Sequence, residues 1–123
     1  MKKYKMYLTY IIFCFFPVFT IHSSNELLYK TLIGHEKSIY SMCFTPDGKF
    51  LISGSSDKSI KIWDFKSGSV LKTLTGHEDY ILSIAVSSDG NYLASGSADR
   101  TIRLWDLKSN ENLKIVLSNK GSV

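Results

Sequence analysis

The 123-residue sequence has little of several features that define other classes of protein. Its two cysteines, Cys14 and Cys43, are too few for a disulfide framework or a thiolate zinc site. Only two prolines, together with a hydrophobic fraction of 44%, exclude a disordered or collagen-like chain. After the first five residues, twelve basic and eleven acidic side chains leave a net charge of +1. That near balance argues against a nucleic-acid-binding surface, which needs Lys and Arg gathered on one face.

A basic start followed by an uncharged apolar run sets residues 1–22 apart from the rest of the chain. The run from Met6 to Ile21 has 16 residues, whereas a membrane-spanning helix takes about 20. We therefore expect residues 1–22 to be a signal peptide or a short signal anchor. The alternative is an accidental extension in front of a soluble domain. A signal would make the protein secreted or membrane-associated, with membrane contact only through residues 1–22 if they are not removed.

The rest of the sequence repeats itself with a period of 42 residues and without gaps. Residues 34–75 and 76–117 are identical at 19 of 42 positions, which excludes a chance match. A repeat of this length indicates a solenoid, a propeller or an array. The clearest recurring groups are Gly34-His35 with Gly76-His77, Asp47-Gly48 with Asp89-Gly90, Ser53-Gly54-Ser55 with Ser95-Gly96-Ser97, and Trp63-Asp64 with Trp105-Asp106.

Each period predicts four short antiparallel strands and no helix. The strands are expected at 39–44, 50–55, 59–63 and 70–74, and in the second copy at 81–86, 92–97, 101–105 and 112–116. An Asp-Gly turn separates the first two strands of each copy, because glycine accepts the positive φ that such turns need. Apolar residues lie on both faces of the first strand of each copy, so that strand is expected to be buried on two sides.

The Gly-His pair is followed by Trp-Asp 29 positions after the glycine in both copies, a pattern that resembles the WD40 repeat family. The resemblance covers about residues 26–117. It implies an all-β fold of four-stranded propeller blades, with repeat 1 at 34–75 and repeat 2 at 76–117. In this family a hydrogen-bonded tetrad of His, Ser or Thr, Asp and Trp stabilises each blade. The matching residues here are His35, Ser53, Asp57 and Trp63, then His77, Ser95, Asp99 and Trp105.

A Ser-His-Asp hydrolase triad is the alternative interpretation of these residue types. A catalytic set normally occurs once, in a pocket beside an oxyanion hole, and has no Trp partner. Two copies at identical spacing therefore favour a structural role, and we expect no enzyme activity. We also expect no cofactor and no metal, because the sequence has neither a phosphate-binding loop that opens a helix nor a recognisable set of metal ligands.

The loop and first strand of each repeat supply the surface where we expect a partner to bind. The candidate contact residues are Lys37, Tyr40, Asp79, Tyr80 and Leu82. A tyrosine near loops is a common anchor at protein interfaces, although Tyr40 has the alternative of packing between blades. A further set of basic residues predicts either a ridge for nucleic acid or, as we favour, a solvated strand edge. These residues are Lys58, Lys61, Arg100 and Arg103.

Two blades are fewer than the roughly 4 to 8 that close a propeller. A further strand is expected within 26–33, at the position that a fourth strand of a preceding repeat would take. Because it precedes the first complete blade, we expect it to be an orphan strand without a sheet to join. Residues 118–123 form a C-terminal tail. Three interpretations of the chain follow. It is a piece of a longer protein, or several copies of it complete one ring, or it is an independent two-blade domain. The last is least favoured because two blades alone leave apolar faces exposed.

These observations together favour a non-catalytic scaffold that binds a protein or peptide through its loop faces. The alternative is an accessory propeller platform of a larger secreted or membrane-anchored enzyme or receptor. A nucleic-acid binder that uses the basic ridge is the third interpretation. An intracellular location, as for many members of the family, is the alternative to secretion.

Overall fold

A computed structural model describes residues 18–21, 30–109 and 112–117. These residues form ten β-strands, which are β1 (Val18–Ile21), β2 (Lys30–Ile33), β3 (Ile39–Phe44), β4 (Phe50–Ser55), β5 (Ile60–Asp64), β6 (Val70–Leu74), β7 (Ile81–Val86), β8 (Tyr92–Ser97), β9 (Thr101–Asp106) and β10 (Asn112–Leu117). Within these ranges no helix is long and apolar enough to cross a membrane. The prediction of an all-β fold is confirmed.

The two repeats fold into two antiparallel sheets of four strands each. Strands β3–β6 form one sheet, which we call blade 1, and β7–β10 form the other, which we call blade 2. In both sheets each strand pairs with the next one along the chain. The turns between the first two strands place Gly48 and Gly90 at φ values of 71° and 73°, which glycine adopts without steric cost. The Asp-Gly pair recurs because both turns need this backbone conformation.

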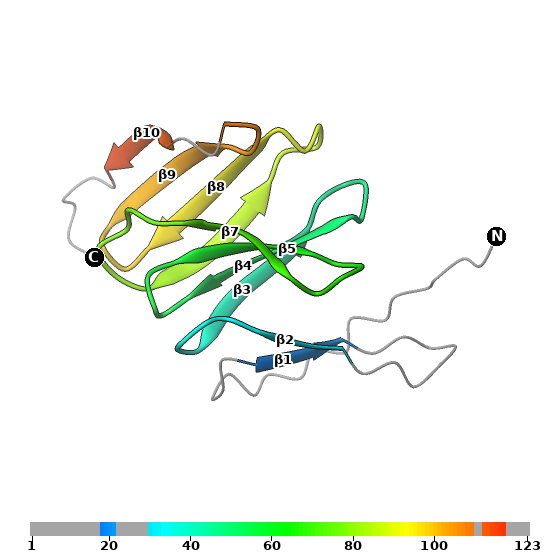
Figure 1. Cartoon of the computed structure of the whole chain (residues 1–123). Helices are drawn as coiled ribbons and strands as arrows, with labels where there is room; N and C mark the ends of the chain where they lie inside the picture. The colour runs from blue at the N-terminus through cyan, green and yellow to red at the C-terminus, as the bar shows by residue number, and fades with distance from the viewer. Residues whose placement is uncertain (1–17, 22–29, 110–111, 118–123) are drawn as a thin grey trace.

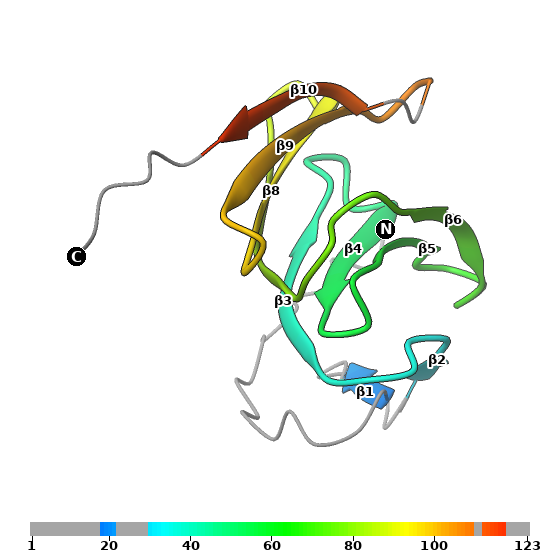
Figure 2. The same ribbon diagram turned by 90° about the vertical axis from the view of Figure 1, so that its left-hand side faces the viewer.

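Three layers stack in the molecule: blade 2, blade 1, and the small sheet of β1 and β2. Both views show blade 1 between the other two layers (Figure 1, Figure 2). The main core lies between the blades and consists of Ile52, Ile60, Ile62, Leu74, Ile81, Leu93 and Trp105. A smaller cluster of Leu32, Leu51 and Trp63 joins β2 to the opposite face of blade 1. Blade 1 is therefore covered on both faces.

Strand β2 lies within 26–33, where the sequence predicted a strand without a sheet to join. In the structure β2 has a partner, because it pairs antiparallel with β1 from Val18 opposite Ile33 to Ile21 opposite Lys30. Strand β1 is itself the end of the apolar run. Most of the signal segment predicted at 1–22 lies outside the described residues, as does the tail at 118–123.

The first strand of each blade is less buried than its apolar pattern predicted. Tyr40 and Met42 in β3 are 48% and 37% exposed, and Leu82 in β7 is 50% exposed. Both strands lie at an edge of their sheets, and they lie beside each other. The neighbouring blade therefore covers only part of each strand, and the expectation of burial on two sides is wrong for these residues.

Candidate functional site

The eight tetrad residues form two matching hydrogen-bonded chains. In blade 1 the Nδ1 atom of His35 lies 2.8 Å from Oδ2 of Asp57, and its Nε2 atom lies 2.7 Å from Oγ of Ser53. Trp63 Nε1 donates to the same Ser53 oxygen over 2.8 Å. In blade 2 the corresponding distances are 2.7, 2.8 and 2.8 Å, along the chain Asp99, His77, Ser95 and Trp105.

The indole group of Trp63 determines which atoms of the first tetrad donate hydrogen bonds and which accept them. An indole N–H can only donate, so the hydroxyl oxygen of Ser53 accepts from Trp63. The hydroxyl proton of Ser53 then points to Nε2 of His35, which accepts it. The Nδ1 atom of His35 therefore carries the ring proton and donates it to the carboxylate of Asp57. This assignment makes His35 neutral and satisfies each polar side chain of the buried set.

A tight turn after β4 places the carboxylate of Asp57 beside the histidine. Lys58 has a φ of 71°, and Arg100 has the equivalent value of 67° in blade 2. Asp57 accepts hydrogen bonds from the backbone N–H and hydroxyl of Ser59 and from the backbone N–H of Glu36. The same carboxylate thus fixes its own turn and the loop that precedes β3.

Burial and hydrogen bonding shift the pKa values of this set in defined directions. Burial lowers the pKa of His35 below its ordinary value of 6.5, although the nearby carboxylate of Asp57 opposes that shift. Partial burial raises the pKa of Asp57, but the hydrogen bonds from Ser59, His35 and Glu36 outweigh it and lower this pKa to about 2. The pKa of Asp99 is lowered for the same reasons. A neutral histidine and an ionised aspartate are therefore the stable pair at neutral pH.

We expect the melting temperature to fall when the pH is lowered from about 7 to about 5. The unfolded chain protonates His35 near its ordinary pKa of 6.5, whereas burial lowers that pKa in the folded protein. The stability linked to neutral His35 is therefore complete above pH 6.5 and declines as the pH drops below it. Asp57 adds a second loss, as the pH falls from its ordinary pKa of 3.8 towards about 2. Circular dichroism melts at each pH measure both losses.

The control for this prediction is His35→Gln, which cannot titrate in the same range. The variant is expected to melt at a lower temperature than the wild type at pH 7, because it changes a buried, fully bonded side chain. Its melting temperature should nevertheless depend less on pH between about 7 and 5. Equal pH dependence in the two proteins would show that His35 does not contribute to the acid sensitivity.

The tetrads bring Ser, His and Asp together at distances that a hydrolase triad also has. Ser53 is nevertheless 0% exposed and Ser95 is 1% exposed, so neither hydroxyl faces a space that a substrate could enter. Each of these hydroxyls also accepts a hydrogen bond from an indole N–H, a partner that a hydrolase triad does not have. The arrangement links strands and loops within each blade.

The candidate contact residues meet at the junction of the two blades. The rings of Tyr40 and Tyr80 contact each other with centroids 6.3 Å apart and an interplanar angle of 40°. Met42 on β3 and Leu82 on β7 are also exposed, and we name these four residues the Tyr40–Tyr80 patch. The sequence analysis did not select Met42, which lies on the same strand as Tyr40 and is 37% exposed.

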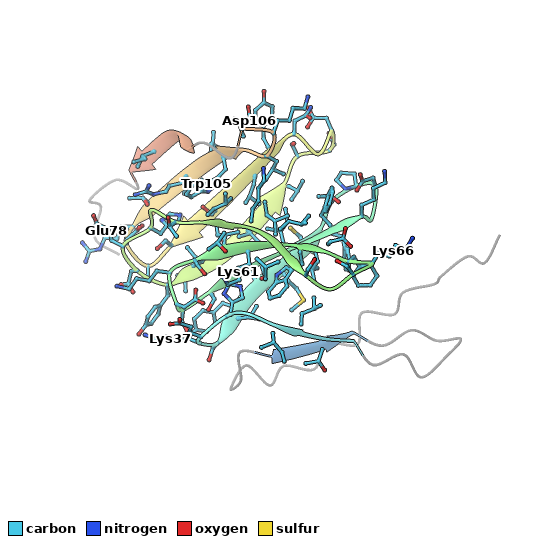
Figure 3. The ribbon with its side chains drawn as sticks, in the orientation of Figure 1. Lys37, Lys61, Lys66, Glu78, Trp105 and Asp106 are labelled. Carbon is cyan, nitrogen blue, oxygen red and sulfur yellow. The ribbon has the colours of Figure 1, made fainter. Side chains whose placement is uncertain are left out.

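Charged side chains lie on the loops around the Tyr40–Tyr80 patch. Lys37 is exposed, and Asp79 is half-buried and accepts the backbone N–H of Tyr80. Figure 3 shows Lys37 and Glu78 at one end of the blades and Lys66 at the opposite end. The two loops that precede β3 and β7 thus lie at the same end of the blades.

The predicted basic ridge is divided between two kinds of position. Lys58 and Arg100 are exposed at the tips of equivalent turns. Lys61 donates to the hydroxyl of Thr73 over 3.0 Å, and Arg103 lies half-buried beside the loop that begins repeat 2. Lys61 and Arg103 are therefore partly engaged within their own blades.

An open groove of about 460 Å³ lies between the blades. Its walls are mainly apolar, from Phe50, Ile52, Ile62 and Leu107, and Asp47 and Asp89 lie at the adjoining turns. Both aspartates accept hydrogen bonds within their own turns, which lower their pKa values. Among the described residues no group of three or more His, Cys, Asp or Glu side chains is placed to hold a metal ion.

Several known proteins are similar to parts of this chain. Nuclear distribution protein PAC1 of Candida albicans is 49% identical over 43 residues, which are 35% of this chain and 9% of that protein. U3 small nucleolar RNA-associated protein 12 of Saccharomyces cerevisiae is 46% identical over 44 residues, which are 36% of this chain and 5% of that protein. The chain thus matches about a tenth or less of the length of these relatives.

Solved structures show the same fold over a larger part of the chain. The structure described as "Structure of U3-55K" superposes with a TM-score of 0.70 and 35% sequence identity. The match covers 72% of this chain and 29% of that one. A second structure, described as RRP9 WD40 repeats, matches equally well. The prediction of propeller blades is confirmed by these neighbours.

The expected secreted or membrane-associated location is corrected by these relatives. Their names refer to nuclear distribution and to small nucleolar RNA, which are intracellular settings. The apolar run at 1–22 led to the expectation, because a basic start followed by apolar residues is typical of a signal. The relatives therefore contradict the expectation of a secreted or membrane-associated protein.

Two segments of the chain match one family model, described as "WD domain, G-beta repeat". They are residues 26–64 and 68–106, and together they make up more than half of the chain. Each segment ends at its Trp-Asp pair, and each contains one complete tetrad. The tetrads, the paired blades and the match to this model agree, and the chain belongs to the WD40 repeat family.

Proposed function

We propose that the protein is a non-catalytic scaffold that binds a protein or peptide through the Tyr40–Tyr80 patch. The observation that carries this proposal is the contact between two exposed tyrosine rings, flanked by exposed Met42 and Leu82 on adjoining strands. Tyrosine is enriched among the residues that dominate binding energy at protein interfaces. Aromatic rings bury a large area at a low cost in side-chain entropy, and methionine adapts to irregular partner surfaces.

The tetrads support this role because they hold the loops beside the patch. The backbone N–H of Glu36 is bonded to Asp57, and that of Glu78 to Asp99. Backbone bonds from Ser56 to Ser38 and from Ala98 to Tyr80 tie the same loops to the turns after β4 and β8. A surface that is already ordered before binding loses less conformational entropy when the partner arrives.

The lack of access to Ser53 and Ser95 supports a role in binding over a role in catalysis. The names of the relatives suggest a second candidate, which is a part in a ribonucleoprotein assembly, since two of them refer to U3. The exposed turn residues Lys58 and Arg100 would then face the RNA or its proteins. The same capture experiment distinguishes the two candidates.

We expect the double variant Tyr40→Ser/Tyr80→Ser to lose its specific partner while the blades stay folded. The test captures proteins from extracts of the source cells with tagged full-length chain and quantifies them by mass spectrometry. Removal of two anchoring rings should lower recovery of a direct partner at least about tenfold, which corresponds to about 1.4 kcal/mol. A photo-crosslinking amino acid at position 80 should attach to that same protein.

The matched control is Ile115→Ser, which changes a residue of similar exposure on β10. This variant should recover the partner as the wild type does. Equal recovery by the double variant, with its circular dichroism spectrum unchanged, would contradict a binding role for the Tyr40–Tyr80 patch. Recovery that disappears when the extract is treated with ribonuclease would favour the ribonucleoprotein candidate.

A further inference from the structure

The groove between the blades is a second surface, separate from the Tyr40–Tyr80 patch. The blades are closest along β3, β4 and β7, and their outer strands diverge from that contact, as Figure 2 shows. Residues of both blades line the groove, whose volume is about 460 Å³. Sites that bind ligands have volumes of about 300–1,000 Å³, with mainly apolar walls and a few polar groups that fix the ligand's orientation. The groove has the size and composition of such a site.

The floor of the groove is an apolar row that runs across the strands of blade 1. Ile52 on β4 lies opposite Ile62 on β5, and Ile62 lies opposite Lys72 on β6. Side chains of directly opposed residues point to the same face, and this face belongs to the core between the blades. The aliphatic stem of Lys72 therefore continues the apolar row, while its ammonium group reaches solvent at the rim.

Three apolar side chains of the groove are accessible to a ligand. Leu71 on β6 is 48% exposed, and Phe50 and Leu107 are half-buried, one in each blade. Phe50 and Leu107 also pack against the core between the blades, which holds them in place. The middle of the groove is therefore suited to aliphatic side chains of a ligand.

Charged side chains lie at both ends of the groove, acidic at one end and basic at the other. Asp47 and Asp89 belong to the turns that join the first two strands of each blade. Lys72 lies on the fourth strand of blade 1, and Lys108 lies in the turn before the fourth strand of blade 2. Because each strand pairs with the next, the first and fourth strands are at opposite edges of a sheet. The groove therefore has an acidic end and a basic end.

The acidic end consists of two carboxylates in neighbouring turns. A Cβ atom at Gly90 would lie 3.5 Å from Cδ of Pro46, so the two Asp-Gly turns are side by side. Both carboxylates accept hydrogen bonds within their own turns, which orient them and lower their pKa values. Lys49 lies beside Asp47 and offsets part of its charge, so Asp89 supplies the larger share of the negative charge.

Lys72 is the accessible cation of the basic end. It is exposed, and within the part of the chain that the structure describes no hydrogen bond or ion pair engages its ammonium group. Lys108 is also exposed and adds a second positive charge. The remaining charged residues of the adjoining turns do not line the groove, and these are Lys49, Asp64, Lys66 and Asp106. The charges that a ligand meets are thus two negative at one end and two positive at the other.

We propose that the groove binds an extended segment of a partner protein with a basic residue at one end, an acidic residue at the other and aliphatic residues between them. From the Asp-Gly turns to β6 is about two and a half strand spacings, or roughly 12 Å. An extended chain rises about 3.4 Å per residue, so the first and fifth residues of a segment are separated by about the same distance. Its second and fourth side chains then point together into the apolar groove, because side chains alternate along an extended chain.

This site does not rest on the binding role of the Tyr40–Tyr80 patch. Tyr40 lies near the start of β3, whereas Asp47 follows the end of that strand. The two surfaces are therefore at opposite ends of the blades, and a partner on one leaves the other free.

Fluorescence polarisation of labelled peptides with the full chain tests the proposal. The probe has the core sequence Arg-Leu-Ser-Leu-Glu between capped ends, and the comparison peptide has Lys in place of the final Glu. At about 0.15 M salt the probe should show saturable binding below about 1 mM, as expected of a short peptide in an open groove. The comparison peptide should bind at least about threefold more weakly, because its final residue repels the lysines of the basic end.

Three variants at exposed positions separate recognition of charge from effects on the fold. Lys72→Glu should abolish or reverse the preference for the probe, whereas a disturbed fold would weaken both peptides alike. Leu71→Ser should weaken both peptides at least about threefold, because it removes an apolar contact. Lys66→Glu is the matched control, since it changes the net charge of the chain equally but lies outside the groove. It should leave the preference unchanged.

The proposal is overturned if neither peptide binds saturably or if the wild-type chain does not distinguish them. It is also overturned if Lys72→Glu keeps the preference, or if Lys66→Glu changes it as much as Lys72→Glu does. The double variant Tyr40→Ser/Tyr80→Ser should bind the probe as the wild type does. Loss of the probe in that variant would locate the peptide on the Tyr40–Tyr80 patch and contradict a separate site in the groove.

Discussion

Replacement of Trp63 by alanine is expected to lower the free energy of unfolding by about 3–5 kcal/mol. Trp63 is completely buried, packs with Leu32 and Leu51, and donates its indole N–H to Ser53. The substitution leaves a cavity and removes one hydrogen bond from a buried chain of three. A small domain has about 5–15 kcal/mol in total, so the loss is a large part of the stability. Urea unfolding followed by circular dichroism measures it.

Two further variants separate packing from hydrogen bonding at this position. Trp63→Phe keeps an aromatic ring but leaves the hydroxyl of Ser53 without its donor, which should cost about 1–3 kcal/mol. Tyr80→Ala removes an exposed ring and should cost less than about 1 kcal/mol. A loss for Trp63→Ala no larger than that for Tyr80→Ala would contradict the assignment of Trp63 to a core between β2 and blade 1.

Replacement of Gly54 by alanine is expected to destabilise the protein by about 1–3 kcal/mol. A Cβ atom at this position would lie 2.5 Å from Cγ2 and 3.1 Å from Cβ of Ile81, and 3.3 Å from Cγ2 of Ile84. Ile81 is buried in the core between the blades and is branched at Cβ, so it has little room to move. The added methyl group therefore forces the two blades apart.

The second repeat supplies the matched control, Gly96→Ala. A Cβ atom there would meet only the hydroxyl oxygen of Ser83, an exposed side chain that can rotate away. The loss should stay within about 0.5 kcal/mol, because alanine also restricts the unfolded chain more than glycine does. The difference in the free energy of unfolding between the two variants is the test. Equal losses would mean that contact between the blades does not limit position 54.

Much of the fold and of the tetrads followed from the sequence because both depend on contacts within one repeat. The period of 42 residues placed the strands, and the resemblance to the WD40 family implied the same eight tetrad residues that the structure joins by hydrogen bonds. A turn such as that of Asp57 and Lys58 is local, so its residues carry a recognisable pattern. Identical spacing in two copies also favoured structure over catalysis.

The location was one part of the sequence analysis that failed, besides the burial of the first strands. Residues 1–22 have the composition of a signal, but composition alone does not say whether an apolar segment enters a membrane or packs elsewhere. In the structure the last part of that run, Val18–Ile21, is a β-strand paired with β2. Apolar side chains serve either purpose, and the pattern of residues is the same for both.

The sequence by itself determined the family, the two blades and the composition of each tetrad. Only the tertiary structure decided that β1 pairs with β2, that Tyr40 meets Tyr80, and that Ile102 is exposed where Ile60 is buried. The physical reason is that burial of a sheet face depends on what lies against it. Two repeats that are identical at 19 of 42 positions therefore differ in the exposure of equivalent residues. The sequence of one repeat does not show what packs against it.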